Sequence, residues 1–136
     1  MQVKVKVARV YEDRERHGDY RVLVDRLWPR GFHKEEIDYD EWAKEITPST
    51  ELRRGYGHDP KRFSDFALGY RGELSAPRAV ETLQRLAAKA VSGVEVTLLT
   101  ATGDLGHSAA AVLAQVLGEL IAAQYHQGLD PGQPSQ

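Results

Sequence analysis

Hydrophobic and polar positions alternate along the first part of the chain in the pattern of β-strands. Valines at every second position of residues 3–7 alternate with lysines, so one face of this strand should be apolar and the other wet. Residues 20–24 are denser in apolar residues and predict a more buried strand. Residues 94–99 are almost continuously apolar, which predicts a central strand covered on both faces.

Helical spacing takes over in the second half of the chain. Phe63, Phe66 and Tyr70 form an aromatic stripe after Asp59-Pro60, a capping carboxylate followed by proline. We interpret this stripe as core packing rather than as a cofactor site. Two more helices are predicted, one from Pro77 to the Ser92-Gly93 pair and one over residues 108–125.

Residues 37–46 fit two structures. A strand would carry Trp42 and Ile46 on one face, and a short helix also fits. We favour the strand, because Thr47-Pro48-Ser49 then begins a helix with proline in its first turn.

This order of elements predicts an α/β fold. We expect a compact, three-layer, Rossmann-like sheet, mostly parallel and flanked by helices. A single domain should cover residues 1–127, and the composition of residues 128–136 is typical of a flexible tail. In such sheets, ligands bind beyond the carboxyl ends of the strands, where loops lead into helices.

Composition narrows the classes of function. The 136 residues are 41% hydrophobic and 28% charged, enough for one core. A net charge of -2 argues against a protein that mainly coats nucleic acid or an acidic membrane. The chain has no cysteine, which excludes disulfides and thiolate chemistry. We expect a cytoplasmic protein with no membrane segment and no metal site, since no apolar stretch or metal-ligand spacing is present, and the sequence leaves a cofactor unknown.

Three polar segments could carry chemistry, and the first directly follows the second strand. It contains Asp25, Arg26, Trp28 and Arg30. Each guanidinium offers five donors in a fixed fork that suits carboxylate or phosphate. The alternative is structural, with Asp25 in an ion pair that staples the loop and Trp28 as a core plug.

The second and third segments lead into predicted helices. The second contains Arg53 and His58, and a histidine titrates near neutral pH. The third lies between the central strand and the last helix and contains His107 and Ser108. Free backbone N–H groups at a helix start could hold an anion there. The alternatives are a hydrogen-bonded loop residue for His58 and a helix cap for Ser108.

The string YRVLVDRLWPRG over residues 20–31 resembles the signature of the DUF488 family, in particular its YeaO-like branch. Further matches are Trp42, Lys44, Glu45, Pro48, Ser49, Leu52 and Arg53, then Gly57-His58-Asp59-Pro60, then Arg62, Phe63 and Phe66. The resemblance implies a compact α/β fold with no settled activity. More distant members carry a cysteine–histidine–arginine motif near the last helix, which a chain without cysteine cannot use. The branch usually has an arginine where this chain has Gly103.

Our leading hypothesis is a pocket for a small phosphate- or carboxylate-bearing ligand at the carboxyl ends of the strands. Arg26, Arg30 and Arg53 would clamp the anion and Asp25 would orient an arginine. His58 or His107 would act as general acid or base if the protein has a reaction.

Two other hypotheses use the same arginines. One is a non-enzymatic protein- or nucleic-acid-interaction module, with Lys4, Lys6 and Trp28 completing its surface. The other makes the arginines an internal ion-pair lattice. The sequence leaves open the oligomeric state, the ligand and whether the protein is an enzyme.

Overall fold

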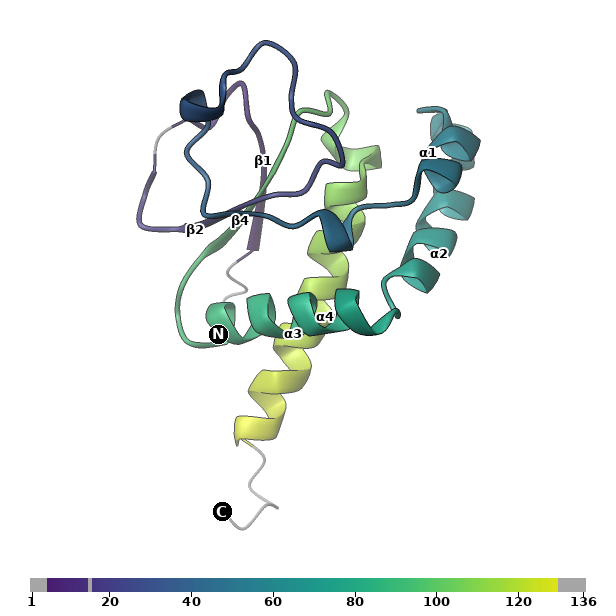
Figure 1. Ribbon diagram of the computed structural model, residues 1–136. Coiled ribbons are helices and arrows are strands. Elements are labelled where there is room, and N and C mark those ends of the chain that lie inside the picture. Colours follow the sequence, from purple (N-terminus) through teal and green to yellow (C-terminus); the bar gives the residue numbers. More distant parts are fainter. Residues whose placement is uncertain (1–4, 15, 130–136) are drawn as a thin grey trace.

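The computed structural model describes residues 5–14 and 16–129, and its centre is a parallel β-sheet (Figure 1). The strands are β1 (Val5–Arg9), β2 (Tyr20–Leu23), β3 (Glu41–Trp42) and β4 (Val96–Thr100). Their spatial order is β1-β4-β2-β3, and every pairing is parallel. The expected α/β class is confirmed. Positions 3 and 4 of the first predicted strand lie outside the described residues.

Four α-helices complete the described fold: α1 (Thr50–Tyr56), α2 (Phe63–Glu73), α3 (Pro77–Val91) and α4 (Ala109–Leu129). Ser49 caps α1 by accepting a hydrogen bond from the Leu52 N–H, so Pro48 lies before the cap and not in the first turn. Asp59-Pro60 begins a 3₁₀ turn, Pro60–Arg62, that leads into α2. Helix α4 continues past Tyr125, and residues 130–136 of the expected tail lie outside the described residues.

Alternation along the strands separates two apolar clusters, and the helices cover only one of them. Val22, Val24, Val96 and Leu98 point to the same cluster as the buried residues of α3 and α4. Those helical residues include Leu83, Leu86, Leu113, Leu117 and Ile121. The period of two in β2 and β4 therefore sends every second side chain to the helices.

The opposite face of the sheet is covered by the long connection from β2 to α1. Leu23 and Leu99 pack there with Ile37 and, from the connection, with further partly buried side chains. These side chains are Trp28, Phe32, Tyr39 and Trp42. The third layer is thus an irregular connection with one 3₁₀ turn, Lys34–Glu36, in place of α-helices, whereas the second 3₁₀ turn, Lys44–Ile46, lies on the helix side of the sheet.

The strand favoured over residues 37–46 is wrong except at β3. Ile37 and Trp42 pack on the connection side of the sheet, whereas Ile46 belongs to the helix-side cluster, where its carbonyl accepts a hydrogen bond from the Tyr70 hydroxyl. The chain must cross from one face to the other within a few residues. A straight strand with Trp42 and Ile46 on one face cannot do this.

A buried polar network lies at the amino ends of the strands. The Arg21 side chain is 1% exposed, and its guanidinium lies 3.2 Å from an Asp13 oxygen and 3.4 Å from an Asp19 oxygen. Asp19 also accepts hydrogen bonds from Thr97 and from the backbone N–H of His17. Burial acts to raise the pKa of Asp19, but these hydrogen bonds and Arg21 outweigh it and hold the pKa at about 2.

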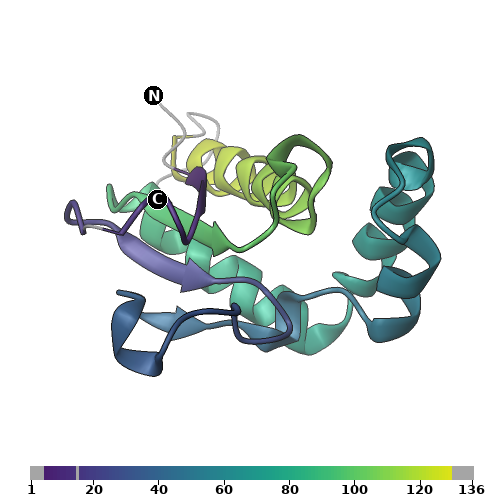
Figure 2. The same cartoon turned by 90° about the horizontal axis from the view of Figure 1, so that it is seen from above.

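Helices α1 and α2 form a hairpin beyond the carboxyl ends of the strands, as the arrowheads in Figure 2 show. The Glu73 carboxylate fastens the start of α1 to the end of α2 by accepting hydrogen bonds from the backbone and hydroxyl of Ser49. Within the described part of the chain, no helix is long and apolar enough to cross a membrane.

Candidate functional site

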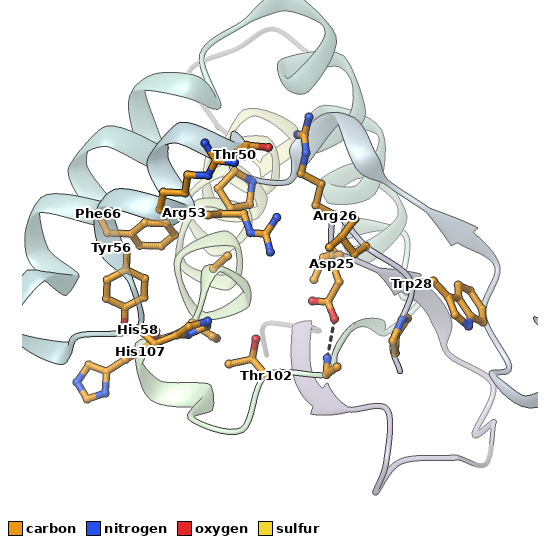
Figure 3. Close-up of a pocket in the computed structure, with 18 of the residues that line it drawn as sticks. Asp25, Arg26, Trp28, Thr50, Arg53, Tyr56, His58, Phe66, Thr102 and His107 are labelled. Carbon is orange, nitrogen blue, oxygen red and sulfur yellow. Dashed lines mark hydrogen bonds between the residues drawn. The ribbon is translucent and has the colours of Figure 1, made fainter. Parts of the chain in front are cut away.

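The three polar segments meet at one cleft of about 630 Å³ beyond the carboxyl ends of the strands (Figure 3). Its walls come from the loop after β2, from helix α1 with the turn that follows it, and from the loop between β4 and α4. All the residues proposed from sequence line it: Asp25, Arg26, Trp28, Arg30, Arg53, His58, His107 and Ser108. The cleft therefore lies at the carboxyl edge of the sheet, where the sequence predicted a ligand pocket.

Four arginines line the cleft, because Arg54 joins the three proposed from sequence. The four side chains are exposed, and within the described residues none of them donates a hydrogen bond or forms an ion pair with the protein. Arginines elsewhere that pair with carboxylates are Arg9, Arg16, Arg21, Arg62, Arg71 and Arg85. Asp25 is the one acidic residue among the described lining residues, so positive charge predominates in the cleft.

Asp25 ties the loop after β2 to the loop after β4. Its carboxylate accepts a 2.6 Å hydrogen bond from the Thr100 hydroxyl and a 2.7 Å bond from the Ala101 N–H. Burial raises the pKa of Asp25, while these hydrogen bonds and the charge of Arg53 act in the opposite direction. The ion pair with an arginine of the same loop is not found in the described chain, and Asp25 holds the loop through Thr100 and Ala101 instead.

Trp28 belongs to the connection-side cluster as much as to the cleft. Its indole N–H donates to the Phe32 carbonyl at 2.7 Å, and its ring meets the rings of Tyr39 and Trp42 edge-on, with centroids 5.8 and 5.6 Å away. Figure 3 shows Trp28 to the side, apart from Arg53. Trp28 therefore packs as part of the apolar cluster, as the structural alternative predicted, and the edge of its ring contributes to the wall of the cleft.

His107 and Ser108 lie at the start of α4 with different partners. His107 Nδ1 lies 2.9 Å from an Asp104 oxygen, and its backbone carbonyl accepts a 2.6 Å hydrogen bond from the Tyr56 hydroxyl. Hydrogen bonding to His107 lowers the pKa of Asp104. The Ser108 hydroxyl accepts from the Ala111 N–H and donates to the Leu105 carbonyl. Ser108 is therefore the helix cap, as the alternative held.

His58 adopts a left-handed backbone conformation with φ of 59°, the only non-glycine residue of the described ranges with a positive φ. It follows Gly57, whose φ of 56° ends α1. The exposed His58 ring lies 6.0 Å from the Tyr56 ring, so Tyr56 has one histidine beside its ring and the other bonded to its hydroxyl. Among the described residues, neither histidine belongs to a group that could hold a metal ion.

Two residues of the site were missed or undervalued from sequence. Tyr56 links α1 to the start of α4 through its hydroxyl, and no pattern in the sequence indicates that long-range bond. Arg54 was recognisable, because it is next to Arg53 on a short predicted helix and both face the cleft.

Fold and site together define a small parallel α/β protein with an arginine-lined cleft at the carboxyl edge of its sheet. The chain belongs to the DUF488 family: residues 4–135 match the family model described as the inactive DUF488-N3 subclade. This confirms the resemblance seen in the sequence.

Similar proteins carry no assigned activity in their names. The chain is 45% identical over 116 residues to the uncharacterised protein Rv3073c of Mycobacterium tuberculosis (strain ATCC 25618 / H37Rv). These aligned residues make up 85% of this chain and 95% of that protein. The uncharacterised protein YeaO of Escherichia coli (strain K12) is 45% identical over 73 residues, covering 54% of this chain and 64% of YeaO. No solved structure matches.

Proposed function

We propose that the cleft binds a small anionic ligand that carries a phosphate or carboxylate group. The observation that carries this proposal is the convergence of Arg26, Arg30, Arg53 and Arg54 on one cleft without protein partners in the described chain. A guanidinium fork matches the geometry of both kinds of anion and can bind either in a bidentate manner.

The charge of the cleft stands out against that of the whole protein. The chain carries a net charge of -2, yet four arginines and one carboxylate line the cleft. A concave site with charges of one sign concentrates the field and attracts the opposite ion. A cleft of about 630 Å³ also lies within the range of about 300–1,000 Å³ that small-molecule sites occupy.

The walls that hold the arginines are fixed by hydrogen bonds. Asp25 joins the loop of Arg26 to the end of β4, and Ser49 with Glu73 joins the helix of Arg53 to α2. Because the backbone that carries the arginines is already fixed, anion binding would need to order only their side chains, which limits the entropy lost.

We infer binding without covalent catalysis. The matching family model is described as an inactive subclade, and the chain contains no cysteine that could serve as a nucleophile. In this proposal His58 and His107 contribute polar contacts at the edge of the cleft, and His107 is oriented by Asp104.

Isothermal titration calorimetry with inorganic phosphate and with malonate tests the proposal. We expect saturable binding of one of them, weakened about tenfold or more in Arg53→Gln, because a charge-assisted hydrogen bond contributes roughly 1.5–3 kcal/mol. Arg78→Gln is the matched control, since Arg78 is exposed, outside the cleft and without an ion pair in the described chain. Absence of binding, or equal loss in both variants, would overturn the proposal.

The interaction-module alternative lacks a specific supporting observation. Lys6 lies near the start of β1 and pairs with Asp13 at 2.8 Å, whereas the arginines lie beyond the carboxyl ends of the strands. Lys4 lies outside the described residues. Binding of an oligonucleotide that weakens steeply with salt, with no response to small anions, would favour this alternative.

A further inference from the structure

The cleft has exposed apolar side chains beside its arginines. The large hydrophobic residues that are exposed within the described chain are Tyr11, Leu27, Leu68, Val80 and Val94. Two of these, Tyr11 and Leu27, line the cleft. Leu27 is 67% exposed and belongs to neither apolar cluster, so its exposure serves no packing that the fold displays.

The position of Leu27 couples it to the cationic part of the site. It directly follows Arg26 and precedes the packed Trp28, and all three residues line the same cleft. An anion on Arg26 would therefore hold whatever is attached to it close to an apolar side chain. Leu27 and Tyr11 thus add apolar surface to a cleft lined by arginines, and small-molecule sites combine apolar lining with a few polar groups in this way.

The far wall of the cleft is also largely apolar. Tyr56 and Phe66 are buried there and stacked, with ring centroids 4.6 Å apart, and Pro48 and Ala109 add to the same lining. Figure 3 shows Tyr56 and Phe66 on the side of the cleft from which Arg53 extends. Both walls thus combine guanidinium groups with apolar or aromatic surface.

We propose that the ligand carries its anionic group on a flat or apolar body, as a nucleotide or an aryl phosphate does. The inference rests on the proposed function, because the arginines must hold the anion. It goes further in stating that Leu27 covers the body of the ligand. A compact anion such as inorganic phosphate would leave Leu27 in water and would bind more weakly.

Four related probes separate the body of the ligand from its anionic group. Phenyl phosphate and adenosine 5′-monophosphate have flat bodies, whereas inorganic phosphate has none and ribose 5-phosphate has a polar one. Calorimetry should show phenyl phosphate binding about tenfold or more tightly than inorganic phosphate, the effect of burying one apolar side chain. A preference for adenosine 5′-monophosphate over both phenyl phosphate and ribose 5-phosphate would identify a nucleotide as the source of this chemistry.

The residue-level test compares two exposed leucines. Leu27→Ser should bring the affinity for phenyl phosphate close to that for inorganic phosphate and leave the affinity for inorganic phosphate unchanged. Leu68→Ser is the matched control, because Leu68 is 74% exposed on α2 and lies outside the cleft. It should change neither affinity.

The outcomes distinguish this inference from the proposed function. If inorganic phosphate binds and phenyl phosphate binds no more tightly, the inference of a flat or apolar body is wrong, whereas the proposed anion site stands. An unchanged preference in Leu27→Ser also overturns the inference. If none of the four probes binds, this inference fails, and the titration with malonate then decides whether the anion site stands.

Discussion

Arginines in this protein have two kinds of environment, and each kind has a different consequence. The buried Arg21 is surrounded by oxygen atoms of Asp13, Asp19 and the Asp38 carbonyl, so its charge is fully compensated. The arginines of the cleft are exposed and have no such partners in the described chain. The same side chain therefore stabilises the fold in one place and is available to a ligand in the other.

Replacing Arg21 should be severely destabilising. Arg21→Met leaves the carboxylate of Asp19, a residue that is 4% exposed, without its cation, and breaking a buried pair in this way costs about 3–5 kcal/mol. Urea unfolding followed by circular dichroism measures the loss. The exposed pair Arg71–Glu119 is the comparison, and Arg71→Gln should cost about 1 kcal/mol or less. Equal losses in the two variants would contradict the structural role of Arg21.

Asp25 should contribute a pH dependence that an asparagine removes. Burial raises the pKa of Asp25 in the folded state above the ordinary value of 3.8, so between these two values the folded state binds more protons than the unfolded state. This contribution to stability is present below 3.8 and is lost as pH rises through the folded pKa. The free energy of unfolding of the wild type minus that of Asp25→Asn should therefore fall as pH rises upward from 3.8. A difference that rises would show a lowered pKa.

At the scale of elements, the short helix α1 depends on its two ends. Ser49 caps its start, and the left-handed Gly57 ends it. His58 continues in the left-handed region, which a residue with a Cβ enters at a cost of roughly 1–2 kcal/mol. The helix that carries Arg53 and Arg54 is thus followed by a turn that stores strain at a residue of the cleft.

This strain predicts an inverted order of two substitutions at one position. His58→Gly should have a free energy of unfolding about 1 kcal/mol higher than His58→Ala, because glycine adopts the left-handed conformation without steric cost. In a regular helix or strand, alanine would be the more stable of the two. Denaturant unfolding of both variants decides the order, and a more stable alanine variant would show that this turn has another conformation.

Elements with a regular pattern of apolar residues were predictable from the sequence, and the segment that crosses from one face of the sheet to the other was not. The aromatic stripe of α2 faces the helix-side cluster along its length, and β4 is buried on both faces, which its apolar run indicates. The strand predicted over residues 37–46 was wrong, because Ile37 and Ile46 lie on opposite faces of the sheet. Only the three-dimensional packing decides which face each residue lies on.

The position of the cleft could be predicted from a general rule of parallel sheets, but the long-range contacts of single side chains could not. Loops after parallel strands share one edge of the sheet, so the meeting of Arg26, Arg53 and His107 could be predicted. The burial of Arg21 could not, because an arginine in a strand is expected on a wet face and its partner Asp13 lies in a polar loop. The hydrogen bond between the Tyr56 hydroxyl and the His107 carbonyl could not be predicted either, because the two residues are far apart in the sequence.

At the scale of the whole molecule, the sheet is an asymmetric layer between helices and an irregular connection. Both tryptophans, Trp28 and Trp42, lie on the connection side, whereas α3 and α4 cover the other side. Tryptophan fluorescence therefore reports on one face of the sheet, and far-ultraviolet circular dichroism reports mainly on the other.

The two signals should change together on unfolding. The strands are shared by both apolar clusters, and small domains of this size usually unfold in one cooperative step. Urea titrations followed by fluorescence and by circular dichroism should give the same midpoint. A fluorescence change at lower urea would show that the connection detaches from the sheet before the helices unfold.

The central place of β4 in the sheet has a consequence for biosynthesis. Strands β1 and β2 do not pair with each other, and each pairs with β4. On the ribosome, β1 therefore lacks a neighbour, and β2 has only the two-residue strand β3 beside it, until Val96–Thr100 have been translated and have left the exit tunnel. Such a topology has high contact order, which slows folding and leaves strand edges open to other nascent chains. The sheet is thus protected only after β4 has emerged and paired with β1 and β2.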